Sequence, residues 1–149
     1  MSQSHSAARL IALTPEAETA LAGPGISVTE VPFHVGRDLR DSERFSFRVL
    51  IDRRRDRVVD PNHLYLREDG GRHRVSREHF SIGINGDSFF LEDCHSACGT
   101  LVEGRVIGGN RQGGKCPLKS GDVIIPGGSH SPFVFKFLAP GTADPKPDA

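Results

Sequence analysis

The sequence predicts an all-β protein, an antiparallel β-sandwich of about 10–11 short strands with one short helix near the N-terminus. Two observations favour this fold class. Short runs of alternating apolar and polar residues recur along the chain, and Gly, Asn and Pro separate them. Helical periodicity occurs in one segment only, so the strand–helix–strand rhythm of a parallel sheet is missing.

The N-terminal elements are expected to be a strand and then the helix. Apolar and polar residues alternate in ARLIALT (8–14), which predicts the first strand. The segment TPEAETALAG (14–23) predicts the helix, because Pro15 suits a first helical turn and Gly23 suits a helix end.

The remaining strands are predicted from alternation and from the turns between them. Asn-Gly at 85–86 separates two apolar runs, which is the strongest short hairpin signal. Before it, Phe80, Ile82 and Ile84 are expected to share the core face of one strand. The predicted strands are VPFHVG (31–36), HLYL (63–66), HFSIGI (79–84), SFFLED (88–93), TLVEG (100–104), DVIIP (122–126) and FVFKFL (133–138).

One folded domain is expected over residues 8–139, a length that can bury a substantial core. Residues 1–7 are expected to be a disordered N-terminus, and residues 140–149 a flexible, Pro-rich tail. Residues 38–60 are long for a connection, so we expect an insertion there, in which RFSFRVLID (44–52) has strand character.

Charge is balanced overall but unevenly distributed. The net charge of +0 gives the whole chain no reason to bind nucleic acid or a membrane surface. However, 12 of the 15 arginines lie between Arg37 and Arg77, among eight acidic residues. This arginine-rich third is a candidate site for an anionic ligand, whereas the RRRDR run (53–57) alone is more typical of a solvated loop.

Cysteine content and apolar runs indicate the compartment. Three cysteines, an odd number, argue against a disulfide framework and for a reducing environment. No apolar run approaches the roughly 18 residues of a membrane helix, and the N-terminus lacks a secretory apolar region. A cytoplasmic protein is therefore expected.

Three motifs suggest chemistry that the surrounding sequence does not favour. GNRQGGKC (109–116) is close to a phosphate-binding loop, but Cys116 stands where Ser or Thr would hold magnesium. Ser76 and His79 suggest part of a hydrolase triad, but residues three apart on a strand point to opposite faces. CHSAC (94–98) supplies one half of a zinc site without a second half, so no metal is expected.

Four segments in a fixed order resemble the forkhead-associated (FHA) domain, a phosphothreonine-reading module. They are PFHVGR (32–37), VSREH (75–79), FLEDCHSACGTLVEG (90–104) and PLKSGDVIIPG (117–127). The resemblance covers roughly residues 8–139. It implies a β-sandwich that binds phosphothreonine peptides through loops at one end, with no enzymatic activity and no cofactor. A planar, permanently charged guanidinium suits a phosphate dianion.

The resemblance assigns roles by motif position. Arg37 and Ser76 would hold the phosphate, and Arg77 would assist. Ala97 and Cys98 occupy the two peptide-facing loop positions, where the family usually has a small polar residue and an asparagine. Structural support of the site is expected from Gly36, His79, Gly99, Thr100, Glu103 and Gly104.

The implied partner is a threonine-phosphorylated protein, either a substrate of a Ser/Thr kinase or the kinase itself, bound by a monomeric domain. Two alternatives stay open. Because Ala97, Cys98 and Glu103 depart from the family pattern, the domain could instead be a phosphate-independent scaffold that docks through a sheet face or through residues 38–60. The other alternative is a thiol or metal site at Cys94, His95 and Cys98.

Overall fold

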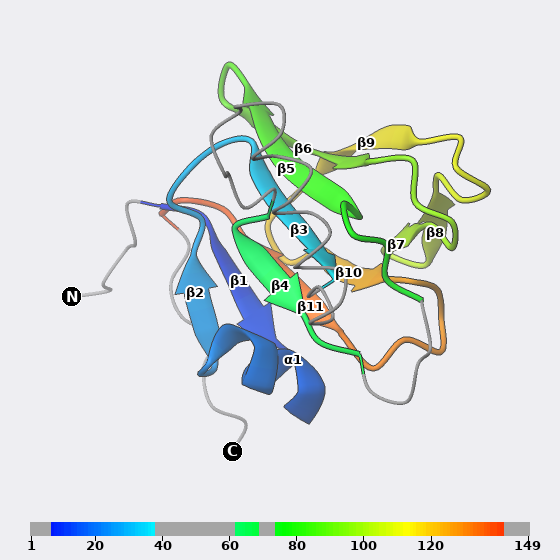
Figure 1. Cartoon of the computed structure of the whole chain (residues 1–149). Helices are drawn as coiled ribbons and strands as arrows, with labels where there is room; N and C mark the ends of the chain where they lie inside the picture. The colour runs from blue at the N-terminus through cyan, green and yellow to red at the C-terminus, as the bar shows by residue number, and fades with distance from the viewer. Residues whose placement is uncertain (1–6, 38–61, 69–73, 142–149) are drawn as a thin grey trace, which may run out of the picture.

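Two β-sheets pack face to face in the structure, which is a computed structural model of the chain (Figure 1). It describes residues 7–37, 62–68 and 74–141. The larger sheet has the order β2 (Gly25–Ser27), β1 (Arg9–Ala12), β11 (Phe135–Leu138), β10 (Val123–Pro126), β7 (Thr100–Val102) and β8 (Arg105–Ile107). The smaller sheet has the order β4 (Leu64–Leu66), β3 (Phe33–Arg37), β5 (Phe80–Asn85), β6 (Ser88–Asp93) and β9 (Gly114–Leu118).

The predicted fold class is confirmed, with one difference in strand direction. The strand pairs are antiparallel except β3 and β4, which run parallel with Val35 opposite Leu64. Parallel neighbours need a long connection, and the chain between these two strands is long enough to supply one. The insertion predicted at 38–60, with its strand at 44–52, lies outside the described residues.

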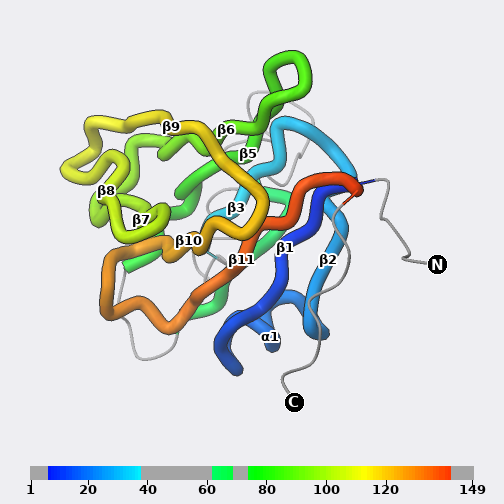
Figure 2. Tube along the Cα trace, turned by 180° about the vertical axis from the view of Figure 1, so that it is seen from behind, coloured from blue at the N-terminus to red at the C-terminus, as the bar shows by residue number. Residues whose placement is uncertain are grey.

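The one described helix, α1 (Pro15–Leu21), follows β1 and lies next to the β1–β2 edge of the larger sheet (Figure 2). Thr14 caps it, because the Thr14 hydroxyl accepts a 3.2 Å hydrogen bond from the Ala17 N–H. The same hydroxyl donates to the carbonyl of Pro132 at 2.6 Å, which fastens the helix start to the loop before β11. No described helix is long and apolar enough to cross a membrane.

Three strands were not predicted: β2, β8 and β9. The first two have three residues each, too short to show alternation. The third contains Pro117, which a sheet tolerates because β9 is an edge strand. Since β9 begins at Gly114, the last residues of the apparent phosphate-binding loop form a strand, and no helix follows to face a nucleotide phosphate.

The core lies between the sheets and consists largely of aromatic and branched side chains. Phe80 and Ile82 of β5 are fully buried, as predicted, and Phe135 and Phe137 of β11 face them from the larger sheet. The prediction for Ile84 is wrong, because its side chain is 43% exposed. By this point β5 has passed the edge of the core and approaches the hairpin turn.

The predicted β5–β6 hairpin is present, with its turn one residue later than the Asn-Gly signal suggested. Asn85 pairs with Ser88, so Gly86 and Asp87 are the central residues. Gly86 has a φ of 64°, which suits the first central position of a type II′ turn.

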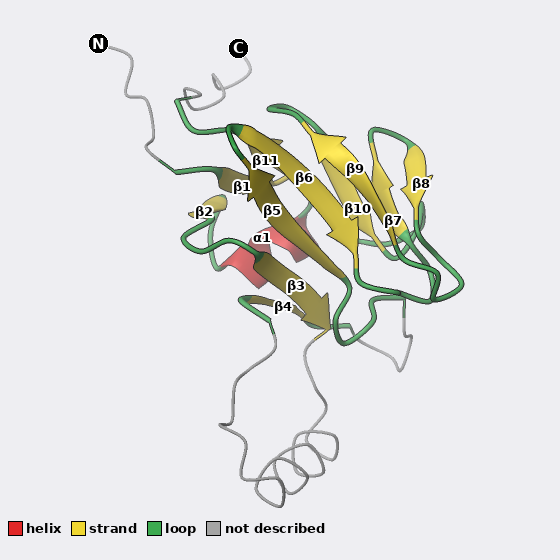
Figure 3. Cartoon of the chain, turned by 90° about the horizontal axis from the view of Figure 1, so that it is seen from above, coloured by secondary structure: helices red, strands yellow, loops and turns green. Residues whose placement is uncertain are grey.

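The strand registers bring several loops to one end of the sandwich. The end of β3, the start of β5 and the end of β6 meet there, since Val35 pairs with Phe80 and Phe80 pairs with Asp93. The start of β9 lies at the same end, opposite Asp93. Figure 3 shows the loops that follow β6 and β8 gathered at this end. We call this the loop end of the domain.

Candidate functional site

Arg37 is the last residue of β3, which lies between β4 and β5 in the smaller sheet and ends at the loop end. Its backbone N–H donates a 2.9 Å hydrogen bond to the carbonyl of Ser76, which joins two segments far apart in the chain. The Arg37 residue is only 7% exposed. A guanidinium in such a position is held largely out of bulk water, where its interaction with an anion is stronger.

Gly36 allows β3 to approach the segment that carries Ser76 and Arg77. A Cβ atom at Gly36 would lie 1.9 Å from the Arg77 carbonyl oxygen and 2.6 Å from Nδ2 of Asn62. The Asn62 amide donates to that same Arg77 carbonyl, at 2.5 Å. Any side chain at position 36 would therefore push the Ser76–Arg77 segment away from Arg37.

Ser76 lies between Arg37 and the β6–β7 loop. Its hydroxyl accepts a 3.2 Å hydrogen bond from the backbone N–H of Ala97. Arg77, the next residue, is exposed to solvent, and so are Ala97 and Cys98 in the facing loop. The structure thus joins three backbone segments, at Arg37, at Ser76–Arg77 and at Ala97–Cys98, which carry the five residues predicted to contact the ligand.

His79 lies beneath these loops and is completely buried. Its Nδ1 accepts a 2.9 Å hydrogen bond from the Ser76 N–H, so the proton is on Nε2, which donates to the Gly99 carbonyl at 2.7 Å. Burial lowers the pKa of His79, although the Gly99 hydrogen bond and the Asp93 charge act in the opposite direction. The neutral imidazole therefore ties the Ser76 segment to the β6–β7 loop.

Asp93 organises the β6–β7 loop from within, although it was not among the predicted site residues. Its carboxylate accepts hydrogen bonds from the Ser96 N–H at 2.9 Å, the Ser96 hydroxyl at 2.6 Å and the Thr100 hydroxyl at 2.9 Å. The Ser96 hydroxyl in turn accepts from the Gly99 N–H at 2.9 Å. The signal was present in the sequence as an Asp three residues before a Ser, at the end of a predicted strand.

Glu68 is a second supporting residue that the sequence analysis missed. Its carboxylate accepts hydrogen bonds from the backbone N–H groups of Arg74 and Val75, directly before Ser76. The Arg74 guanidinium donates to the carbonyl of His130 at 2.9 Å, which connects this segment to the loop before β11. No sequence pattern would have paired Glu68 with these residues, because the contact depends on how the loops pack.

The structure does not bring Glu103 and Gly104 to the loop end. They are the central residues of the β7–β8 turn, at the other end of β7 from Thr100. The Glu103 carboxylate accepts a 2.9 Å hydrogen bond from the Val123 N–H, so it fastens this hairpin to β10. Their predicted support of the site is therefore limited to holding the hairpin, whereas Gly99 and Thr100 take part in the loop network.

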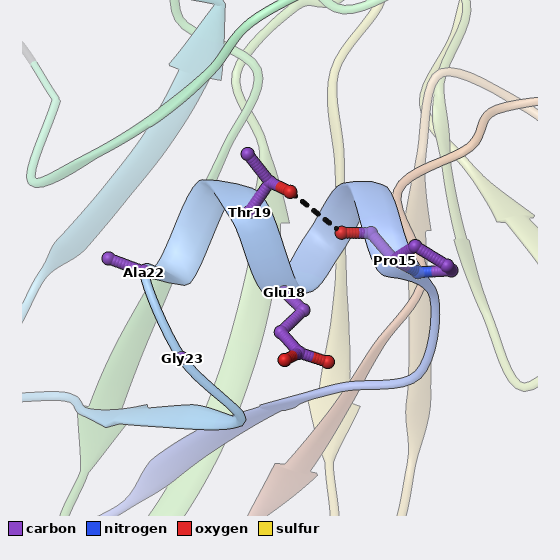
Figure 4. Close-up of a pocket in the computed structure, with 5 residues that line it drawn as sticks. All are labelled: Pro15, Glu18, Thr19, Ala22 and Gly23. Carbon is purple, nitrogen blue, oxygen red and sulfur yellow. Dashed lines mark hydrogen bonds between the residues drawn. The ribbon is translucent and has the colours of Figure 1, made fainter.

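Neither the CHSAC motif (94–98) nor a hollow along α1 has the features of a functional site. Within the described residues, no group of three or more His, Cys, Asp and Glu side chains could hold a metal ion, which leaves the motif at Cys94 without a metal-binding geometry. Burial raises the pKa of the Cys94 thiol, which disfavours a reactive thiolate. A shallow hollow along α1 is lined by Pro15, Glu18, Thr19, Ala22 and Gly23 (Figure 4), but the Thr19 hydroxyl donates to the Pro15 carbonyl within the helix.

The fold and the site define a β-sandwich module in which the loops at one end form a polar site held by hydrogen bonds. The sequence profile of the FHA domain matches residues 33–127, and the chain belongs to this family. FHA domains are interaction modules that use their own arginine side chains to recognise phosphorylated motifs. No curated protein sequence matches the chain.

Solved structures support the same fold. The chain is similar to the FHA domain of the CT664 protein from Chlamydia trachomatis, with 21% identity, a TM-score of 0.55, and 89% of this chain and 97% of that chain covered. It is also similar to the kinase-interacting FHA domain of kinase associated protein phosphatase from Arabidopsis, with 20% identity, a TM-score of 0.56, and 95% of this chain and 100% of that chain covered. A third similar structure is Mycobacterium tuberculosis EmbR in complex with a low affinity phosphopeptide, with 19% identity, a TM-score of 0.57, and 94% of this chain and 26% of that chain covered.

Proposed function

We propose that this domain binds threonine-phosphorylated peptides at the loop end and acts as a phosphorylation-dependent interaction module without enzymatic activity. The observation that carries the proposal is the junction of Arg37, Ser76 and Ala97. The Arg37 N–H donates to the Ser76 carbonyl, and the Ser76 hydroxyl accepts from the Ala97 N–H. These hydrogen bonds join the backbone of Arg37 to the Ser76 segment and the Ser76 hydroxyl to the loop at Ala97, which supports a phosphate site at this junction.

These groups suit a phosphate for electrostatic reasons. A phosphothreonine carries about −1.5 to −2 charges near pH 7 and three strong acceptor oxygens. The Arg77 side chain is exposed, and no carboxylate among the described residues forms an ion pair with it, so it can add a second cation. Each charge-assisted hydrogen bond contributes roughly 1.5–3 kcal/mol. Three of them would dominate a micromolar interaction of about −8 kcal/mol.

The supporting network is well suited to present these groups without rearrangement. His79 connects Ser76 to Gly99, and Asp93 fixes Ser96, Thr100 and, through the Ser96 hydroxyl, the Gly99 N–H. Both side chains are at least 99% buried, with exposures of 0% and 1%. Preorganised loops lose little conformational entropy on binding, which favours affinity.

The proposed partner is a threonine-phosphorylated protein, either a kinase substrate or the kinase itself. The test is a phosphothreonine peptide library with unphosphorylated and phosphoserine counterparts of each sequence, followed by calorimetry on the enriched peptides. Wild-type protein is expected to enrich phosphothreonine sequences, and Arg37→Ala to weaken their binding at least about ten-fold. Arg37→Lys should also bind more weakly, because lysine cannot donate the paired hydrogen bonds of a guanidinium.

Arg105→Ala is the matched control. Arg105 is also an arginine, but it is exposed on β8 beside the β7–β8 turn, away from the loop end. Its removal changes the net charge by the same amount and should leave phosphopeptide affinity unchanged. Equal enrichment of phosphorylated and unphosphorylated peptides by the wild-type domain would refute the proposal. Partner binding that survives Arg37→Ala would instead favour the phosphate-independent scaffold.

A further inference from the structure

A tight turn at residues 109–112, between β8 and β9, departs from ordinary turn chemistry. The Gln112 N–H donates a 3.0 Å hydrogen bond to the Gly109 carbonyl. The two central residues, Asn110 and Arg111, have φ values of 51° and 60°. Positive φ at both central positions is the mark of a type I′ turn, which strongly prefers Asn followed by Gly.

Another turn of the same chain has the residue type that this geometry prefers. In the β7–β8 hairpin the central residues are Glu103 and Gly104, with φ values of 50° and 79°, so glycine occupies the second position. At the corresponding position of the other turn stands Arg111, an L-residue in the left-handed region, where its Cβ is strained. Strain of this kind persists where the surrounding structure holds it, and it often marks a functional site.

The turn is held against the β6–β7 loop by three hydrogen bonds. The Asn110 N–H donates to the Ala97 carbonyl at 2.9 Å, and the Arg111 N–H donates to the Ser96 carbonyl at 3.0 Å. Nδ1 of His95 donates to the Arg111 carbonyl at 3.1 Å. A single residue, Ala97, therefore contacts both this turn and the Ser76 hydroxyl, so the turn adjoins the proposed phosphate site.

The Arg111 side chain has no evident role in folding. It is exposed, and no carboxylate of the described residues forms an ion pair with it. The three hydrogen bonds of the turn to its neighbouring loop use backbone atoms of residues 110 and 111 and would form equally well with glycine at position 111. A cation thus stands at a strained position beside the phosphate site, where glycine would stabilise the fold.

We propose that Arg111 is a specificity-determining residue that contacts an acidic side chain of the bound phosphopeptide, close to the phosphothreonine. This inference rests on the proposed function, because it assumes that the peptide lies along the β6–β7 loop. The contact is at the rim of the site and exposed, so it selects among phosphopeptides and adds a small increment to their affinity.

The test uses a binding phosphothreonine peptide in which one Asp is moved along the sequence a position at a time, each compared with its Asn counterpart. For the wild-type domain, Asp at one position should improve affinity about three-fold over Asn at low ionic strength. The improvement should vanish in high salt. It should also be absent in Arg111→Gly and Arg111→Gln, which should bind the Asn peptides as the wild type does.

Asn110→Gly provides the matched control, because it introduces glycine into the same turn while keeping the cation. Arg111→Gly should raise the melting temperature by about 2–4 °C, whereas Arg111→Gln should not, nor should Asn110→Gly, because asparagine already suits the first central position. Of these three variants, only Asn110→Gly should retain the wild-type preference for peptides with Asp.

The possible failures are distinguishable. An undiminished Asp preference in Arg111→Gly, with phosphate dependence intact, would overturn the role of Arg111 and leave the proposed function standing. A wild-type domain that binds phosphorylated and unphosphorylated peptides equally would refute both. A uniform loss of affinity for Asp and Asn peptides in Arg111→Gln would also overturn the inference, because it would indicate a general structural role.

Discussion

Replacement of His79 by phenylalanine tests whether a single neutral imidazole holds the loop end together. Phenylalanine keeps a planar ring in the fully buried position but can neither accept from the Ser76 N–H nor donate to the Gly99 carbonyl. The substitution therefore separates the two hydrogen bonds from the packing of the ring. We expect both lower stability and a weaker phosphopeptide interaction.

The magnitude follows from the two groups that lose their partners. A buried polar group without a hydrogen bond costs about 1–3 kcal/mol. Gly99 is buried, so its carbonyl should bear the full cost, whereas Ser76 is half-buried and its N–H can regain water in part. The free energy of unfolding should therefore fall by about 2–4 kcal/mol in His79→Phe.

The pH dependence supplies a second, independent signature. Because the pKa of His79 is lowered in the folded protein, the unfolded chain takes up the proton first as the pH falls. The stabilisation that His79 confers is complete above its unfolded pKa of about 6.5 and is lost progressively below it, down to the folded pKa. The slope in this window reaches about 1.4 kcal/mol per pH unit. His79→Phe should lack this component.

The assay is urea denaturation followed by far-ultraviolet circular dichroism from about pH 5 to pH 8, the range in which histidine titrates. Dichroism is the suitable probe because the chain has no Trp and one Tyr. Any other titrating groups are shared by both proteins, so the difference between the two stability curves isolates His79. If the wild type and His79→Phe lost stability in parallel below about pH 6.5, the reasoning about the neutral imidazole would be refuted.

Two further substitutions test the architecture of the site. Gly36→Ala should lower the free energy of unfolding by about 1–3 kcal/mol and weaken phosphopeptide binding, because its Cβ would meet the Arg77 carbonyl oxygen; an unchanged urea midpoint would contradict this. Asp93→Asn should cost about 2–3 kcal/mol in the same assay, because an amide N–H₂ would replace one of the oxygens that accept from Ser96 and Thr100. Equal midpoints for Asp93→Asn and the wild type would show that the carboxylate charge is not needed there.

Much of the local structure could be predicted from the sequence, because it depends on neighbours in the chain. Pro15 and Gly23 indicated the helix within two residues at each end, and Asn-Gly at 85–86 indicated the hairpin. What the sequence did not predict concerns burial, two short strands, and β9, which contains Pro117. Alternation placed Ile84 on the core face, but only the packing of the second sheet determines where the core ends.

The extent of the domain also differs from what local motifs indicate. The family profile covers residues 33–127, but β1 and β11 outside it pair with each other, Arg9 opposite Leu138. The domain over 8–139 stays a prediction, and the predicted N-terminal and C-terminal tails lie almost entirely outside the described residues. The paired strands supply core residues such as Leu10 and Phe137, both fully buried.

The sequence by itself determined the class of fold, the family motifs and the residue types suited to a phosphate, because periodicity and motif order are properties of the chain alone. Only the tertiary structure decided that Arg37 and Ser76 share a hydrogen bond, that Asp93 and His79 support their loops, and that Arg111 adjoins them. The physical reason is that these contacts join strands and loops distant in sequence. They form only when both sheets close and exclude water from the polar groups beneath the site.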